Sequence, residues 1–77
     1  MRNLLKNIVY QVIKNNNSIT KDEIKNQVYD FAVENKILTK EFVIAFGDIG
    51  WVFQTLRQDD ELVKVERMGR HYFWSVI

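Results

Sequence analysis

The chain contains no cysteine and no proline, and only three of its 77 residues are glycine. Without cysteine it forms neither a disulfide nor a thiolate metal site, which is compatible with a reducing compartment. Long apolar runs are also missing, since Phe42–Phe46 and Trp51–Phe53 are far too short to span a membrane. Polar residues interrupt the amino-terminal stretch 1–7 too often for a secretion signal. We therefore expect a soluble, cytoplasmic protein without a membrane partner.

Catalytic chemistry has few residues to draw on. There is a single histidine, His71, and Gly47 and Gly50 alone are too short and generic a motif for a phosphate-binding loop. The three consecutive acids at 59–61 point in different directions, so a solvated turn explains them better than a metal site. A lone histidine beside a strand is more typical of a half-exposed structural residue than of a pH-sensitive group. The sequence therefore predicts no enzyme, no cofactor and no metal.

The net charge of +1 hides an uneven distribution. Residues 1–21 carry four basic side chains and no acidic one, residues 22–61 carry four basic and nine acidic, and residues 62–77 carry three basic and one acidic. The bases thus lie toward both ends and the acids in the middle. Because a nucleic-acid binder usually has a clearer basic surplus, the total charge argues mildly against tight, non-specific DNA binding.

Residues 3–15 are predicted to form the first helix. Apolar residues recur there as adjacent pairs every four positions, which places them on one face of a helix. The polar run at 15–18 ends it, because these side chains compete with helical backbone hydrogen bonds. The predicted inner face consists of Leu4, Leu5, Ile8, Val9, Val12 and Ile13.

A capping box is predicted to begin the second helix. The Thr20 side chain can accept a hydrogen bond from the Glu23 amide, and the Glu23 side chain can reach back to the Thr20 amide. This helix is expected to end near Asn35. Ile19 precedes the cap and has two possible roles: it packs on the new helix as a hydrophobic staple, or it forms a one-residue β-bridge to a later hairpin. The predicted inner face of the helix consists of Ile24, Val28, Phe31 and Ala32.

Two shorter helices follow. Thr39 is predicted to cap a short apolar helix that Gly47 stops, and Asp48 to cap a further helix at 49–58. The buried residues of that last helix are expected to be Ile49, Val52, Phe53 and Leu56. Its opposite face is expected to carry Trp51, Gln54, Thr55 and Gln58.

After the acidic break, two β-type runs, 62–66 and 71–76, flank Met68 and Gly69. A two-residue turn at Met68-Gly69 pairs Val65 with Tyr72 and Val63 with Trp74 on the inner side. The same turn pairs Lys64 with Phe73 and Glu66 with His71 on the outer side. Met-Gly is not a favoured hairpin pair, so a slip of one residue, which would swap the faces, stays open.

The order of helix, capped helix, helix and hairpin with a Gly-Arg tip resembles a winged helix. Residues 49–58, followed by Leu62-Val63-Lys64-Val65 and Gly69-Arg70-His71-Tyr72, resemble the recognition helix and wing of the winged helix-turn-helix superfamily. The segment 37–47 is longer and more apolar than the tight turn usual before that helix. The resemblance implies an α+β fold of three to four helices and a two-stranded β-hairpin wing, as one domain over residues 1–77. It also implies double-stranded DNA as the partner.

DNA recognition is our first hypothesis for the function, as a transcriptional regulator or a DNA-reading accessory factor. Glutamine can hydrogen-bond adenine in the major groove, and threonine can touch a thymine methyl. Arginines at the hairpin tip can contact phosphates or enter a minor groove. Depending on which side the first helix presents, Lys6, Lys14 or Lys21 can add phosphate contacts. The alternative to DNA contact is that these residues form an ordinary polar helix face and wing tip without a ligand. The candidate DNA-binding residues are Trp51, Gln54, Thr55, Gln58, Lys64, Arg67 and Arg70.

A protein partner is the alternative hypothesis. An exposed tryptophan is more typical of a protein interface than of a base-reading helix, although Trp51 would be core if it packs on Phe42 or Phe46. Together with Tyr10, Tyr29 and Phe73 it amounts to more aromatic surface than a small monomer easily hides, which favours a homodimer or another protein. The short, Asn- and Lys-rich chain is compatible with a phage-type factor that acts on a host protein.

Overall fold

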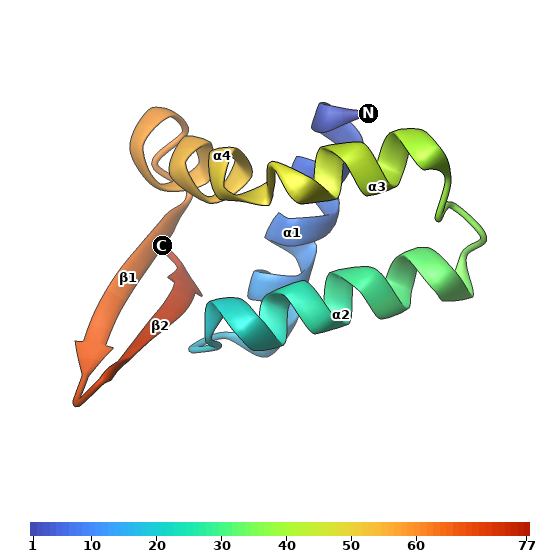
Figure 1. Ribbon diagram of the computed structural model, residues 1–77. Coiled ribbons are helices and arrows are strands. Elements are labelled where there is room, and N and C mark those ends of the chain that lie inside the picture. The colour runs from blue at the N-terminus through green and yellow to red at the C-terminus, as the bar shows by residue number, and fades with distance from the viewer.

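Four helices precede a carboxy-terminal β-hairpin in the computed structural model, which describes all of residues 1–77 (Figure 1). The helices are α1 (Arg2–Asn16), α2 (Lys21–Glu34), α3 (Lys40–Gly47) and α4 (Ile49–Gln54), and α4 continues into a π-helical turn, η1 (Thr55–Asp59). The strands are β1 (Val63–Met68) and β2 (His71–Val76). The expected α+β class and element order are confirmed, and they give a winged-helix-like layout. None of the helices combines the length and the apolar character needed to cross a bilayer.

The hydrophobic core is built around α1, which contacts α2, α3, α4 and β2. Figure 1 shows α1 behind the other helices, between α2 on one side and α3 with α4 on the other. All 16 buried residues are hydrophobic, so no buried charge has to be compensated. The core holds five of the six residues predicted for the inner face of α1 and three of the four predicted for α2.

Leu4 and Phe31 were wrongly predicted to be buried, because both are exposed. Leu4 lies one residue before the buried Leu5, which is about 100° round the helix and at the edge of the apolar stripe. Phe31 faces the polar flank of α1, where it lines a shallow groove with Gln11 and Asn15. Both errors arise at the margins of the helix faces, where the neighbouring element decides burial.

Both threonine side chains cap their helices as predicted, but the return bond to the Glu23 side chain, the other half of the predicted capping box, does not form. Thr20 Oγ1 accepts a hydrogen bond from the Glu23 amide at 3.4 Å, and Thr39 Oγ1 accepts one from the Phe42 amide at 3.2 Å. The prediction for Asp48 is wrong, since its side chain caps nothing. Gly47 is the last residue of α3 rather than a stop beyond it, because its φ is not positive and a single residue, Asp48, joins α3 to α4.

The predicted helix at 49–58 is present, but its second half is π-helical. The Asp60 amide donates to the Thr55 carbonyl at 2.9 Å, five residues back rather than four. The four residues expected to be buried, Ile49, Val52, Phe53 and Leu56, all lie in the core. A π-turn changes the direction in which the following side chains point, and it carries Arg57.

The hairpin turns at Gly69 and Arg70, so the predicted register is wrong. Val65 lies opposite Trp74 and Val63 opposite Val76, each two residues further along β2 than expected. A shift of two preserves the alternation of faces, so the predicted inner and outer faces are retained. Gly69 has a φ of 65° while Arg70 has a negative φ, the pattern of a turn with glycine at its first central position.

Ala in place of Gly69 is expected to lower the free energy of unfolding by about 1–2 kcal/mol, because a Cβ disfavours a positive φ. Gly50→Ala is the matched control: Gly50 lies in α4, and an added Cβ there meets no atom within 4 Å. This control is expected to raise the stability by up to about 1 kcal/mol. Urea unfolding measures both, and effects of the same sign would contradict the turn assignment.

Ile19 forms the one-residue β-bridge that the sequence left open. Its amide donates to the Trp74 carbonyl at 3.0 Å, and the Trp74 amide donates to the Ile19 carbonyl at 2.7 Å. The order across the sheet is therefore Ile19, β2, β1. Since α2 begins two residues after Ile19, this bridge holds the amino-terminal end of α2 against β2.

Candidate nucleic-acid interface

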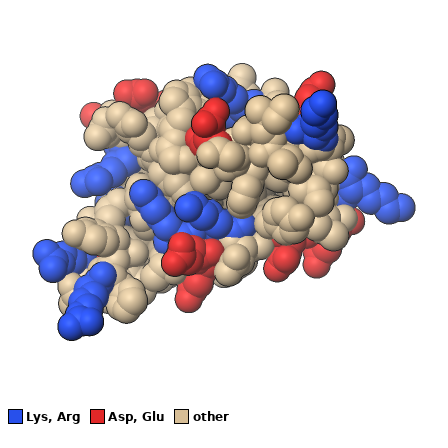
Figure 2. Space-filling view, viewed as in Figure 1, with Lys and Arg blue, Asp and Glu red and all other residues tan.

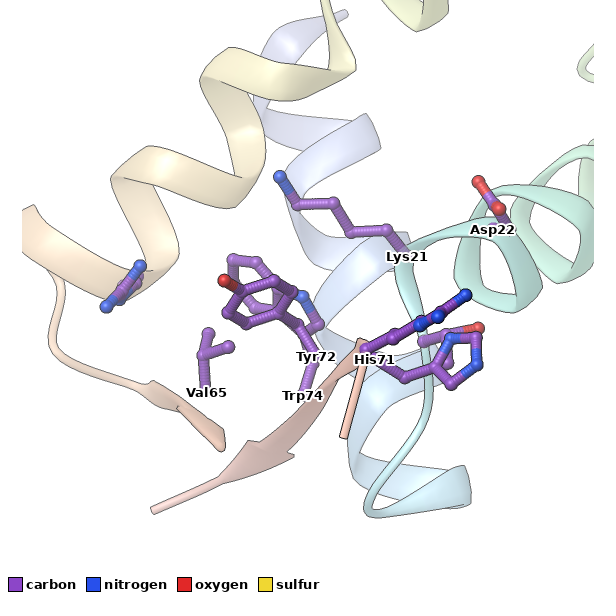
Figure 3. Close-up of a pocket in the computed structure, with 9 residues that line it drawn as sticks. Lys21, Asp22, Val65, His71, Tyr72 and Trp74 are labelled. Carbon is purple, nitrogen blue, oxygen red and sulfur yellow. The ribbon is translucent and has the colours of Figure 1, made fainter. Parts of the chain in front are cut away.

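Three elements that are distant in sequence surround one pocket of about 490 Å³ (Figure 3). They are the start of α2, the η1 turn, and the hairpin, which contributes its inner face together with residues 70 and 71 at its tip. The Ile19 bridge positions the first element, and the alternation of side chains along β2 directs Tyr72 and Trp74 toward the pocket. The lining residues are Thr20, Lys21, Asp22, Arg57, Val65, Arg70, His71, Tyr72 and Trp74.

The charge of the pocket is predominantly positive. Lys21, Arg57 and Arg70 come from α2, η1 and the hairpin turn respectively, and Asp22 is the one carboxylate among the lining residues. Figure 2 shows Lys and Arg side chains over the hairpin, at the lower left, and over the adjoining centre of the same face. The near-neutral net charge of the chain therefore coexists with a locally basic surface.

Trp74 forms the floor of this region and is only 4% exposed. Its ring packs on Phe53 with the centroids 5.0 Å apart. The Lys21 ammonium lies 5.2 Å from each of these two ring centroids, which is within the range of a cation–π contact. The indole Nε1 of Trp74 is buried without a hydrogen-bond partner. A buried donor of this kind is uncommon in folded proteins and calls for a physical explanation.

The predicted hairpin residues do not form one group. Arg70 lines the pocket, whereas the exposed Arg67 donates from Nε to the Gly69 carbonyl at 3.0 Å and lies over the Tyr72 ring at 5.9 Å. Lys64 lies on the other face of β1, where its ammonium is 3.6 Å from Glu66 Oε1. The structure therefore brings Arg67 and Arg70 to the tip and separates Lys64 from them.

The predicted helix-face residues are also divided. Gln54 Nε2 donates to Gln58 Oε1 at 3.2 Å, so these two exposed amides form a pair. Thr55 is half-buried at the flank of the helix. Trp51 is 41% exposed, and the guanidinium carbon of Arg2 lies over its ring, 5.1 Å from the ring centroid. The alternative of a Trp51 buried against Phe42 or Phe46 is therefore wrong.

Two basic residues that line this pocket, Lys21 and Arg57, were not predicted to do so from the sequence. Arg57 was not among the candidate DNA-binding residues, and Lys21 was one of three lysines considered for phosphate contacts. The structure distinguishes Lys6 from Lys21, because Lys6 is paired with Asp60 at 3.0 Å while Lys21 lines the pocket with the hairpin. The place of Lys21 could have been predicted from its position two residues after Ile19, because a β-bridge at Ile19 brings Lys21 to the hairpin.

Comparison of the chain with protein-family models, with curated proteins and with solved structures finds no match.

Proposed function

We propose that the chain is a winged-helix protein that binds double-stranded DNA, as a transcriptional regulator or a DNA-reading accessory factor. The observation that carries this proposal is the convergence of Lys21, Arg57 and Arg70, from three separate elements, at one pocket beside α4 and the hairpin. Because phosphate contacts dominate the affinity of proteins for DNA, a basic surface next to a solvent-exposed helix suits a duplex.

In this arrangement α4 and η1 enter the major groove and the hairpin tip follows the adjacent backbone. The paired amides of Gln54 and Gln58 face solvent, and Gln54 Oε1 and Gln58 Nε2 take no part in the bond between them, so they remain free to accept and to donate. Adenine presents a donor and an acceptor in the major groove, so this amide pair is suited to an A·T base pair. Arg67 and Arg70 at the tip supply contacts to phosphates.

The test is a titration of a fluorescently labelled duplex, followed by anisotropy at several salt concentrations. With about three to four phosphate contacts, the affinity is expected to fall with a logarithmic salt slope of about −3 to −4. Arg70→Ala is expected to weaken binding on every duplex and to reduce the slope by about 1. Absence of any anisotropy change at low salt would contradict the proposal.

Two variants separate base reading from general electrostatics. Lys40→Ala removes one positive charge at the start of α3, which Figure 1 shows at the opposite end of the molecule from the hairpin, and is expected to have little effect. Gln54→Ala is expected to weaken binding selectively, by about 1–3 kcal/mol on the preferred duplex and little on others.

A protein partner is the second candidate, favoured by the 41% exposure of Trp51 and by the exposed Val43 and Ile44 on α3. A partner protein or a second copy of this chain would cover these side chains. Trp51→Ala is then expected to abolish capture of a partner or to shift a homodimer to monomer in sedimentation equilibrium. A partner or dimer retained equally by the variant would count against this surface.

A further inference from the structure

We infer that the pocket between the start of α2 and the hairpin receives one phosphate group, to which the Trp74 indole N–H donates a hydrogen bond. This inference deepens the proposed function and rests on it for the source of the phosphate, a linkage of the DNA backbone. The pocket is then a specific binding site for one phosphate rather than part of a diffuse basic surface.

The first reason is the buried donor. An indole nitrogen has a hydrogen to donate and no acceptor capacity, so only an acceptor can satisfy it. Trp74 is 96% buried, since 4% is exposed, and no protein atom accepts from its Nε1. Figure 3 shows the ring nitrogen on the side of Trp74 toward Lys21. The nitrogen itself is closed to solvent, so the side chains around it must move for an acceptor to enter beside Lys21. That acceptor would then remove the cost of this unpaired donor.

The second reason is that the start of α2 adds further donors. The Ile24 amide makes the first intrahelical bond, to the Thr20 carbonyl at 3.0 Å, and the Glu23 amide is capped by Thr20. The amides of Lys21 and Asp22 precede that bond and are left for an external acceptor. The positive end of the α2 dipole favours an anion at the same place.

The third reason is the charge and its spacing. Lys21, Arg57 and Arg70 approach from different elements, which suits a tetrahedral oxyanion with oxygens in several directions better than a planar carboxylate. Asp22 is the one acidic residue of the lining, and Figure 3 shows its carboxylate pointing away from Tyr72 and Trp74. The acceptor that completes this set is therefore an anion supplied from outside the chain.

The direct test observes the indole N–H signals of the uniformly ¹⁵N-labelled full chain by NMR. The chain has two tryptophans, so Trp51→Phe assigns the two signals. The probes are a short DNA duplex and inorganic phosphate, the latter compared with chloride at equal ionic strength. We expect the Trp74 signal to move downfield with the duplex and, at higher concentration, with phosphate. The Trp51 signal is the internal control in the phosphate arm and is expected to stay in place.

Each other outcome is decisive. Duplex binding seen by anisotropy, with an unmoved Trp74 signal, would overturn this inference and leave the proposed function standing. A Trp74 signal that moves with phosphate, in a chain that binds no duplex, would support the phosphate-binding site and overturn the proposed function. A Trp74 signal unmoved by either probe, without duplex binding, would overturn both.

A pair of lysine variants gives a second readout that leaves every buried core side chain in place. Lys21→Gln removes the charge beside Trp74, and Lys25→Gln removes the same charge one turn later on α2, outside this pocket. The concentration of phosphate needed to move the Trp74 signal is expected to rise about tenfold in Lys21→Gln, since it loses a charge-assisted contact. It is expected to be unchanged in Lys25→Gln. Equal responses of the two variants would overturn the assignment.

Discussion

Replacement of Lys21, Arg57 and Arg70 together by glutamine is expected to lower the affinity for duplex DNA by about 100-fold or more at low salt. Each charge-assisted contact to a phosphate contributes about a factor of five to ten, and the three contacts lie on one surface. The logarithmic salt slope is expected to become shallower by about 2.7, since three phosphate contacts are lost. Anisotropy titrations of the same duplex measure both quantities.

The matched control replaces Lys25, Lys36 and Lys40 by glutamine. Both triple variants change the net charge from +1 to −2, because each loses three positive charges. The control is expected to lower the affinity by less than about threefold, since its charges lie outside the pocket and make none of the proposed phosphate contacts. An equal loss in both variants would show that only the net charge matters and would contradict a defined interface.

Phe53→Ala is expected to have the largest effect on stability, about 3–5 kcal/mol. Phe53 is 1% exposed and supports the Trp74 ring at the floor of the pocket. A domain of this length has a total stability of roughly 4–12 kcal/mol, so this one change removes a large share of it. Chemical denaturation followed by circular dichroism measures the loss, and near-ultraviolet signals report on the packing of Trp74.

Phe31→Ala provides the matched comparison, because it removes the same side chain from an exposed position. Its cost is expected to be smaller, about 1–2 kcal/mol, since 42% of Phe31 is already exposed and the replacement loses less buried apolar surface. Similar losses for Phe31→Ala and Phe53→Ala would contradict the division of the two phenylalanines between surface and core.

The helices were predictable because their determinants are local. Thr20 and Thr39 lie three residues before the amides that they cap, and the apolar repeat of α1 follows the helical period within one segment. The burial of Leu4 and Phe31 was wrongly predicted because it depends on which element packs against the helix. The sequence around these two residues does not contain that information. The register of the hairpin depended on which pair of residues turns, and Gly69 occurs in both possible pairs.

The site was only partly predictable, because it is assembled from distant segments. The hairpin tip and the amide pair of Gln54 and Gln58 follow from the strand and helix patterns. The pocket needs Ile19 to bridge Trp74, which brings Lys21 to the hairpin across more than fifty residues of sequence. The π-turn that carries Arg57 has no recognisable sequence signal, so the third charge of the pocket was not foreseen.

A map of backbone amide shifts in the ¹⁵N-labelled chain, recorded as an unlabelled DNA duplex is added, tests the proposed DNA interface directly. The largest changes are expected at the start of α2, along α4 and η1, and at the hairpin tip, within 20–22, 50–58 and 67–72. The far half of α2 and the start of α3 are expected to be unaffected. Changes confined to α3 and the far half of α2, or no changes at low salt, would contradict the proposed interface.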